Sequence, residues 1–426
     1  MSSKAKTVRL GILGLGNVGS GLVELIRKNA EVIERKSDLR FEIVCALVKN
    51  RKKKRPLPPE LITYKPEEVV CSPEVDIVVE LIGGVEPART FILKALESGK
   101  SVVTANKAVL ASHGDEIFEA ATRNRCQIGL EASVCGGIPI IRALSSGLIA
   151  NQVTQLMGIL NGTSNYILTT MQEDGIGFKE ALRNAQKKGL AEADPSFDIK
   201  GLDAAHKLLI LSELTFQTKA SLSEIIVEGI ENIEEEDISA AKQFGFVIKP
   251  VALGTRSENK LDLRVHPALI HHTHPLASVR HEFNAVLVRG DAIGEMIFYG
   301  KGAGSLPTAS AVLSDIVEIA RNPHATMLWN PSKSVRHSPA ESSSRFYFRF
   351  PIYDRPGLIG KIATVLGNYE VSITDAVARL TCNQTNRGNV MIVTHSASES
   401  AVRDALKEIS RTNVLAAPAV AVRILE

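Results

Sequence analysis

The sequence lacks the features that mark disulfide-rich, membrane-spanning and nucleic-acid-binding proteins. Its five cysteines are an odd number and include no CxxC pair, which argues against a disulfide framework and against a zinc site. No apolar run is long enough to span a bilayer, and the N-terminus has no signal-peptide core. The net charge of +3 gives no support for nucleic-acid binding. We therefore expect a cytoplasmic protein with neither a nucleic acid nor a membrane as its partner.

The composition that remains is that of an ordinary globular chain. Hydrophobic residues make up 44% and charged residues 23% of the sequence. A length of 426 residues is enough for about two to four domains.

An apolar run over residues 8–13 leads directly into a glycine-rich turn. A helical pattern over residues 20–35 and a second strand over residues 41–48 follow it. Strand, glycine turn, helix and strand are typical of a doubly wound nucleotide-binding sheet, in which the turn and the helix N-terminus hold a pyrophosphate. The positions that we expect to bind the dinucleotide here are Gly14, Gly16, Asn17, Val18 and Gly19.

The end of the second strand indicates which dinucleotide is bound. NAD-selective sites usually place an acidic residue there to bind the ribose 2′-hydroxyl, whereas this strand is followed by Lys49 and by the basic run 51–55. A solvated basic loop would give the same pattern. We expect NADP, with NAD as a second possibility, and assign the 2′-phosphate to Lys49 and Arg51.

More strand and helix patterns follow, with strands over residues 75–82, 101–104 and 127–132 and a helix over 88–97. Ligands of such sheets lie at the carboxyl ends of the strands. We therefore expect the cofactor to meet Gly83, Thr104 and Lys107. A later glycine-rich segment, 300–304, precedes a helix over 308–321, and we expect Gly304 to meet the cofactor from the other side.

The loop after the strand at 127–132 is rich in glycine and begins beside Glu131. Its backbone carbonyls could turn toward a cation. A plain turn explains the same residues, and the residues alone leave both interpretations open.

The stretch 185–207 concentrates acidic side chains in a punctuated loop. It follows a strand over residues 153–160 and a helix over 164–173. Its charged members are Glu192, Asp194, Asp198, Asp203 and, one helical turn beyond, Lys207. On a helix Asp203 and Lys207 share a face, which suits binding a zwitterionic amino acid and moving a proton. A solvated loop with a helical ion pair is the alternative.

Two further regions complete the chain. A possible helix starts at Ser223, and residues 266–274 carry four histidines, which we interpret as a solvated or structural loop because no matching acidic or cysteine ligands stand nearby. The histidines are His266, His271, His272 and His274. After a linker the pattern βαββαβ predicts a small ferredoxin-like module over residues 345–426 that binds rather than catalyses.

Several motifs resemble those of one family. The stretch 185–207 resembles, at every defined position, the signature of homoserine dehydrogenases. GILNGTSNYIL at 158–168 and TANK at 104–107 resemble two further blocks of that family. The tail resembles an ACT domain, with DRPGL at 354–358 matching its usual first turn.

The resemblance implies a function and a domain plan. The reaction would be reversible NAD(P)H-dependent reduction of L-aspartate 4-semialdehyde to L-homoserine, in threonine, methionine and isoleucine biosynthesis. The fold class would be α/β, with an N-terminal Rossmann domain, an α+β catalytic and dimerisation domain and a ferredoxin-like ACT domain. The boundaries would be 1–139 (completed by 301–322), 140–300, a linker at 323–344, and 345–426.

The resemblance also assigns roles to residues. Lys207 would pass a proton to or from the substrate oxygen with Lys107 nearby, and two close lysines should lower each other's pKa. Glu192, Asp198 and Asp203 would hold the amino group or position Lys207, and Gly189 joins the cofactor-binding positions. A sodium or potassium ion would bind the Glu131 side chain and the carbonyls of Val134, Gly136 and Ile138. We further expect a homodimer or homotetramer and L-threonine as effector.

Two other functions are compatible with part of the sequence. Aspartate-semialdehyde dehydrogenase acts on the same aldehyde but needs an acylating cysteine, for which Cys135 is the only candidate and lacks a suitably placed histidine. A non-catalytic amino-acid sensor with an ACT module should have lost Lys107, Lys207 or the glycines, and it has lost none of them.

Overall fold

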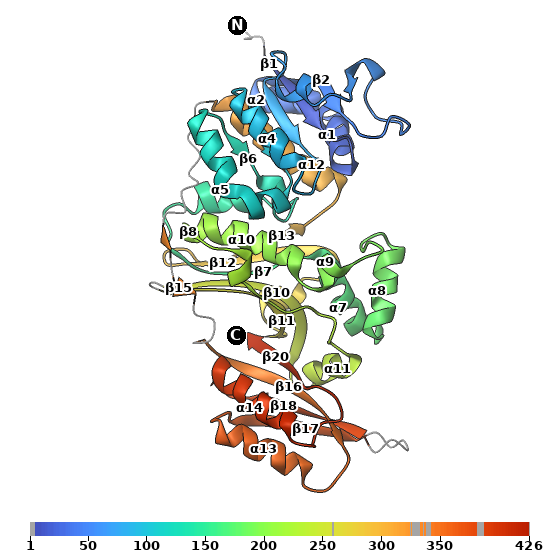
Figure 1. Ribbon diagram of the computed structural model, residues 1–426, viewed down its shortest axis with the longest axis vertical. Coiled ribbons are helices and arrows are strands. Elements are labelled where there is room, and N and C mark those ends of the chain that lie inside the picture. Colours follow the sequence, from blue (N-terminus) through green and yellow to red (C-terminus); the bar gives the residue numbers. More distant parts are fainter. Residues whose placement is uncertain are drawn as a thin grey trace.

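The protein has three parts stacked along its long axis, with the N-terminal part at one end and the C-terminal part at the other (Figure 1). The computed structural model describes residues 5–257, 260–323, 325, 333–334, 336–337, 342–380 and 387–425. No helix in these ranges is long and apolar enough to cross a membrane.

The N-terminal part is built on a six-stranded parallel sheet in the order β3-β2-β1-β4-β5-β6. Its strands are β1 (Lys6–Leu13), β2 (Leu39–Leu47), β3 (Ile62–Thr63), β4 (Ile77–Glu80), β5 (Ser101–Thr104) and β6 (Ile128–Gly129). The strand order reverses between β1 and β4, so the ligand crevice of such a sheet lies at the carboxyl ends of these two strands. The doubly wound sheet predicted from the sequence is confirmed.

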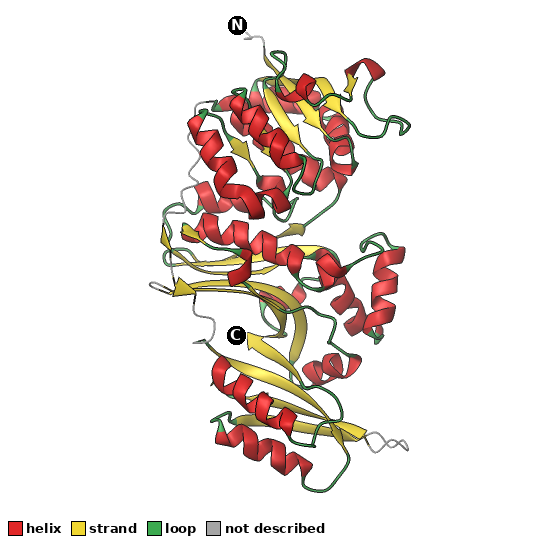
Figure 2. Ribbon diagram, in the orientation of Figure 1, coloured by secondary structure: helices red, strands yellow, loops and turns green. Residues whose placement is uncertain are grey.

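Helices cover both faces of this sheet (Figure 2). They are α1 (Asn17–Lys28), α2 (Ala30–Ser37), α3 (Glu67–Val70), α4 (Ala88–Glu97), α5 (Lys107–Arg123) and, from much later in the chain, α12 (Ser305–Arg321). Helices α1 and α12 cross closely, because a Cβ on Gly21 would lie 2.4 Å from Ser305 Oγ. The chain thus returns to the N-terminal sheet after building the middle part.

Two predicted elements of this part are wrong in extent. The helix predicted over residues 20–35 is two helices, because Asn29 leaves the helical conformation (φ −109°, ψ 17°) between α1 and α2. The strand predicted over 127–132 ends at Gly129. The N–H of Glu131 donates to Asp315 Oδ2 (2.9 Å) instead of to a neighbouring strand, and a 3₁₀ turn begins there.

The middle part is a sheet with helices packed on one of its faces (Figure 2). Its long strands are β7 (Val153–Ile159), β10 (Phe246–Ser257), β11 (Lys260–His271), β12 (Phe283–Gly290) and β13 (Gly294–Lys301), in the order β13-β12-β7-β10-β11. Its helices are α6 (Ile140–Arg142), α7 (Gly162–Asp174), α8 (Phe178–Lys187), α9 (Ser196–Ile199), α10 (Leu202–Phe216) and α11 (Glu235–Gln243). The mostly apolar α10 is buried between this sheet and α5.

Two further predictions about the middle part are corrected. The possible helix at Ser223 is only a 3₁₀ turn, Leu222–Glu224, and the short strand β9 (Ile226–Val227) follows and pairs with β11. The histidine-rich segment is not one loop, since β11 continues to His271 and buries His266, which is 1% exposed. No group of three or more metal-ligating side chains occurs in the described ranges.

The C-terminal part has the predicted βαββαβ order. It consists of β16 (Ser343–Tyr353), α13 (Leu358–Asn368), β17 (Ile373–Leu380), β18 (Arg387–Thr394), α14 (Glu399–Arg411) and β20 (Val420–Leu425), with β19 (Ala397–Ser398) as a short addition. Short pairs also link β8 (Thr218–Lys219) to β14 (Lys333–Ser334), and β11 to β15 (Arg336–His337). Most of the predicted linker lies outside the described residues.

The middle and C-terminal sheets are continuous, which the sequence did not predict. Strand β20 pairs in parallel with β11 over Ala268–Ile270, and on its other side it pairs with β16. The C-terminal part is therefore attached edge to edge through a strand ladder (Figure 1).

Candidate active site

The glycine turn after β1 forms a cradle with room for a ligand. A Cβ on Gly14 would lie 2.8 Å from Leu81 O, and one on Gly19 would lie 2.3 Å from Gly14 O, so both positions require glycine for packing. At Gly16 a Cβ would meet nothing within 4 Å. Gly16 also precedes α1 without a side-chain cap, so the first N–H groups of α1 remain available to an anion. The cradle fits a dinucleotide pyrophosphate.

The basic run after β2 divides into exposed and inward-pointing members. Lys49 and Arg51 are exposed, and the Arg51 guanidinium lies 4.2 Å from the centre of the Tyr64 ring. Arg55, which we did not predict, donates to Leu15 O inside the glycine turn. Its position at the end of the basic run was the only sequence signal for it.

Buried polar contacts fix the ends of β4 and β5. Glu80 is fully buried, and it accepts hydrogen bonds from Thr104 Oγ1 (2.6 Å) and Ile82 N (2.7 Å). Burial raises the pKa of Glu80, against the effect of these bonds. Asn106 caps α5 and donates to Gly84 O (2.6 Å). The first residue of α5 is Lys107, so these contacts hold the backbone from which Lys107 extends.

The centre of the site is a carboxylate between two ammonium groups. Asp203 Oδ2 lies 2.7 Å from Lys207 Nζ, and Asp203 Oδ1 lies 3.0 Å from Lys107 Nζ. Asp203 is 4% exposed; burial opposes its ionisation, but the charges of Lys207 and Lys107 outweigh burial and lower the pKa of its carboxyl group. Lys107 comes from the N-terminal part and Asp203 from the middle part, so the cluster joins the two.

The expectation that the two lysines lower each other's pKa is wrong for Lys207. Burial disfavours its charged form, but the carboxylate of Asp203 outweighs burial and raises the pKa of Lys207. The physical reason is that Asp203 stands between the two ammonium groups.

An asparagine of the GILNGTSNYIL block organises the acidic side chains. Asn161 Nδ2 donates to Asp203 Oδ2 (2.8 Å) and to Asp198 Oδ1 (2.7 Å), while its Oδ1 accepts from Ser164 N (2.7 Å) and caps α7. Burial raises the pKa of Asp198. Asn161 was not among the predicted site residues, although its position at a helix start was a usable signal.

The remaining predicted residues of this stretch lie outside the cluster. Glu192 is exposed, and its backbone carbonyl accepts from Gln186 Nε2 (3.1 Å). Gly189 follows α8 with φ +73° and open space around it. The structure thus brings together Asp198, Asp203, Lys207 and Lys107, and shows no contact of Glu192 or Gly189 with them.

Protein-family models match three stretches of the chain. A model described as homoserine dehydrogenase matches residues 139–317, one described as the NAD-binding domain of homoserine dehydrogenase matches 14–131, and an ACT domain model matches 352–412. A homoserine dehydrogenase of Bacillus subtilis is 39% identical over 417 residues, which cover 96% of each chain. The chain belongs to the homoserine dehydrogenase family.

Solved structures agree with this assignment. A homoserine dehydrogenase from Thiobacillus denitrificans has a TM-score of 0.92 and 40% identity and covers 99% of each chain. A hyperthermophilic archaeal homoserine dehydrogenase in complex with NADPH has a TM-score of 0.61 and 25% identity, over 74% of this chain and 98% of that chain. The protein is therefore an NAD(P)-dependent oxidoreductase acting on a CH–OH group, with a C-terminal ACT domain, as the motifs predicted.

The geometry around Cys135 agrees with the family and argues against the acylating alternative. Cys135 is 1% exposed, and burial raises the pKa of its thiol. An acylating cysteine needs an accessible thiolate, which a buried thiol with a raised pKa does not provide. The non-catalytic sensor is likewise set aside, because the dehydrogenase identity is shown.

The loop predicted to hold a cation is well ordered by protein contacts. The Glu131 carboxylate accepts from Ile141 N (2.8 Å) and Arg142 N (2.9 Å) at the start of α6, and burial raises its pKa. Val134, Gly136 and Ile138 are buried, and Ile138 O accepts from Ile140 N (2.8 Å). The two bonds to Glu131 leave its carboxylate further acceptor capacity, so the residues fit a small cation without requiring one.

Proposed function

We propose that Lys207 is the acid–base group of this homoserine dehydrogenase and that Asp203 positions it. The observation that carries the proposal is the Asp203 carboxylate between Lys207 and Lys107. When bound, the nicotinamide cofactor supplies or accepts the hydride. As the aldehyde is reduced, its oxygen gains negative charge, and an adjacent ammonium group stabilises and protonates that oxygen.

The hydrogen bonds of Lys207 support this role. An ammonium group has three N–H donors. One reaches Leu160 O (2.7 Å) and one reaches Asp203 Oδ2 (2.7 Å), which leaves the third for the substrate oxygen. The Lys107 side chain is 31% exposed against 11% for Lys207, and we assign it the second contact with that oxygen. We assign the substrate amino group to Asp198 and Glu192.

The test is replacement of each lysine in the full chain. We expect Lys207→Met to lower kcat by about 10²–10⁴-fold, because proton transfer contributes that much, while NADPH binding measured by fluorescence is kept. Lys200→Met, a change at an exposed lysine of the same stretch, is the matched control. A Lys207→Met enzyme with more than half of the wild-type kcat would disprove the role.

For the cofactor we propose a preference for NADPH. Lys49 and Arg51 follow β2, where a 2′-phosphate would lie, and the archaeal relative was solved in complex with NADPH. Replacing both residues by alanine should raise KM for NADPH far more than KM for NADH. The pair Lys53→Ala and Lys54→Ala removes the same charge from the same run and should leave the ratio unchanged. Equal weakening for both cofactors would contradict the assignment.

We further propose a sodium or potassium ion at Glu131 and the carbonyls of Val134, Gly136 and Ile138. Hard cations prefer oxygen ligands, and the loop presents a carboxylate and buried backbone around the glycines. Activity should then depend on sodium or potassium chloride when compared with a choline salt at equal ionic strength. Glu131→Gln should weaken that dependence.

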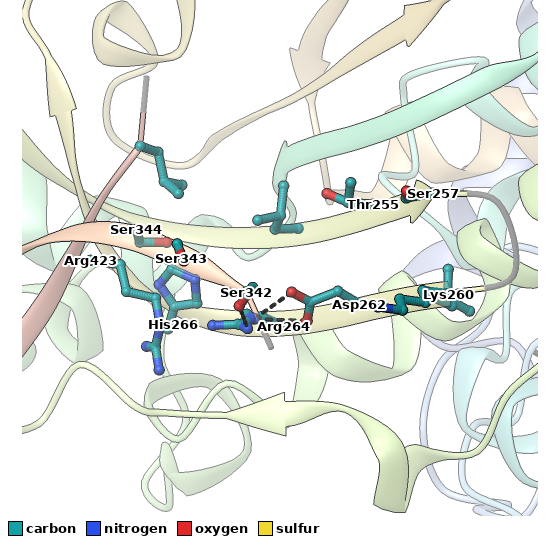
Figure 3. Close-up of a pocket in the computed structure, with 13 residues that line it drawn as sticks. Thr255, Ser257, Lys260, Asp262, Arg264, His266, Ser342, Ser343, Ser344 and Arg423 are labelled. Carbon is teal, nitrogen blue, oxygen red and sulfur yellow. Dashed lines mark hydrogen bonds and ion pairs between the residues drawn. The ribbon is translucent and has the colours of Figure 1, made fainter. Parts of the chain in front are cut away.

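We propose L-threonine as the effector of the ACT domain. Contacts at the junction of the middle and C-terminal parts connect that domain to the candidate active site. Arg423 of β20 donates to Glu228 (2.9 Å). Two residues later Ile230 N donates to Ile199 O (2.9 Å), next to Asp198. A cavity of about 300 Å³ beside Arg423 lies between β10, β11, the start of β16 and the end of β20 (Figure 3).

Threonine titration of the full chain tests this proposal. We expect inhibition at millimolar threonine, and weaker inhibition in Arg423→Met, where the bond to Glu228 is lost. If threonine does not affect the activity of the full-length protein, the module has another ligand or only a structural role. The intact chain is required, because removing the ACT domain also removes β20 from the edge of β11.

The assembly and the domain plan complete the proposal. We propose a homodimer or homotetramer, because the edge strand β13 exposes Ile297 (40%) and Tyr299 (55%), and light scattering on the intact protein tests it.

We keep the domain boundaries given from the sequence. The free thiols of Cys45 and Cys71 suit a cytoplasmic location.

A further inference from the structure

A buried asparagine shares a hydrogen-bond acceptor with Lys207. Asn284 lies in β12 and is 1% exposed. Its Nδ2 donates to Leu160 O (2.8 Å), the same oxygen that accepts from Lys207 Nζ (2.7 Å). The Leu160 carbonyl therefore joins the two side chains.

The buried amide of Asn284 is expected to lower the stability of the folded protein. Its Oδ1 is buried and has no hydrogen-bond partner among the described residues. A buried amide oxygen without a donor is unfavourable, whereas a leucine of similar volume would carry no such penalty. Gly302 packs directly on the amide, since a Cβ there would lie 2.1 Å from Asn284 Cγ. A packed but half-satisfied amide is best explained by the bond that its Nδ2 makes.

That bond holds a residue that the strand ladder does not hold. Strand β7 ends at Ile159, which is paired with Ala285 of β12, and Leu160 follows it. Asn284 stands beside Ala285 and ties the Leu160 carbonyl to β12. Its Nδ2 also lies 3.5 Å from Cys135 Sγ, so one side chain contacts both the loop of Glu131 and the segment that holds Lys207.

We propose that Asn284 is a positioning residue for Lys207: by fixing the Leu160 carbonyl it fixes the direction of the Lys207 ammonium group. The inference rests on the proposed role of Lys207. With Leu160 O and Asp203 Oδ2 both fixed, two of the three N–H directions of Lys207 are set, and the third points at the substrate oxygen. Without Asn284 the carbonyl can turn, and the ammonium group turns with it.

The test uses Asn284→Leu in the full-length enzyme. We expect kcat to fall about 10- to 100-fold, because a small displacement of a reacting group has an effect of that size. Binding of NADPH by fluorescence should stay unchanged, and the melting temperature should not fall. The solvent deuterium isotope effect on kcat should rise, because proton transfer becomes slower relative to the other steps. Wild-type kcat, or a reduced kcat with an unchanged isotope effect, would overturn the proposal.

A second variant disturbs the hydrogen bond between Asn284 and Leu160 without changing Asn284 itself. Gly302→Ala should displace the Asn284 amide and reproduce the fall in kcat and the rise in isotope effect. Gly360→Ala, at an exposed position of α13 where a Cβ would meet nothing within 4 Å, is the matched control and should change neither. A Gly302→Ala enzyme with wild-type kcat and isotope effect would count against Asn284.

The two proposals fail separately. If Lys207→Met keeps its activity, the role of Lys207 is wrong whatever Asn284 does. If Lys207→Met is inactive but Asn284→Leu behaves as wild type, the acid–base role stands and only the positioning role is lost.

Discussion

Around Asp203 one carboxylate lies between two ammonium groups, whereas around Arg423 each guanidinium group is matched by carboxylates. Arg423 pairs with Glu228 (2.9 Å) and Glu399 (2.5 Å), and Arg264 pairs with Asp262 (2.7 Å) and also with Glu399. Figure 3 shows Arg264 reaching Asp262 and Ser342 at this junction. Two ammonium groups flank one carboxylate in the first cluster, whereas in the second two guanidinium groups face three carboxylates, those of Glu228, Glu399 and Asp262.

The difference distinguishes the candidate active site around Asp203 from the structural connection between domains around Arg423. A lysine has three donors that can be redirected, and Lys207 gives one to Leu160 O and one to Asp203 Oδ2. A guanidinium group is a rigid fork, and at the junction its N–H groups are committed to carboxylates on β9 and α14 or their ends. A carboxylate shared by two ammonium groups that keep a spare donor suits proton transfer, whereas rigid donors bound to several carboxylates suit a fixed connection between domains.

The largest expected effect comes from removing the central carboxylate. Asp203→Asn should lower kcat for homoserine oxidation by about 10²–10⁴-fold, because the ammonium groups lose the charge that orients them. Steady-state kinetics measures this. Asp194→Asn, at an exposed carboxylate of the same stretch that binds Ser196, should change kcat less than twofold. Similar losses in both variants would remove the distinction between the cluster and its surroundings.

The junction should respond in stability rather than in chemistry. Arg423→Met leaves the partly exposed Glu228 without this partner and removes one of the two arginines on Glu399, and the loss of such charged hydrogen bonds costs about 1.5–3 kcal/mol. Urea unfolding should show the loss, and kcat without threonine should change less than tenfold. A kcat loss as large as that of Asp203→Asn would show that the junction takes part in catalysis.

A buried histidine at the junction should make stability depend on pH. Burial first, and the charge of Arg423 second, lower the pKa of His266 from 6.5 to about 4. In the unfolded chain the His266 imidazole is therefore protonated below about pH 6.5, whereas in the folded chain it stays neutral down to about pH 4. The free energy of unfolding therefore decreases as the pH falls from 6.5 to 4. The loss should reach about 3 kcal/mol. His266→Leu should flatten the pH dependence of the melting temperature over this window, whereas His395→Leu, at an exposed site, should leave it unchanged.

The smallest expected effect comes from an exposed pair. Lys219 and Asp115 are 2.9 Å apart, but their side chains are 55% and 54% exposed. Lys219→Met should change the free energy of unfolding by no more than about 0.5 kcal/mol. A larger loss of unfolding free energy would mean that burial is not the reason why the two clusters are expected to matter more than this exposed pair.

The elements that the sequence predicted well are those with local causes. The glycine turn at Gly14–Gly19 lies between a short apolar strand and a helix, and Asp203 and Lys207 share a helix face by spacing alone. The break at Asn29 was missed because the apolar pattern continues across it and no proline or glycine marks it.

The parts of the site that were missed depend on tertiary contacts. Lys107 was placed at the cofactor crevice by its position after a strand and near the substrate oxygen by resemblance, but its ion pair with Asp203 requires two domains to meet. Asn284 reaches Leu160 across 124 positions, and nothing in its neighbourhood in the sequence signals a functional amide. The union of β11 with β20 was missed for the same reason, since a βαββαβ module reads as complete by itself.

The pairing of β20 with β11 also has a consequence for biosynthesis. Strand β20 is translated after β11 and α10, so until then β11 has no partner from β20 at Ala268–Ile270, although β9 and β15 pair with β11 elsewhere along that edge. An unpaired strand edge is a site for association with other chains. Translation of the ACT module therefore closes this part of the sheet edge, and a chain that ends between β16 and β20 leaves Ala268–Ile270 of β11 open to pairing with other chains.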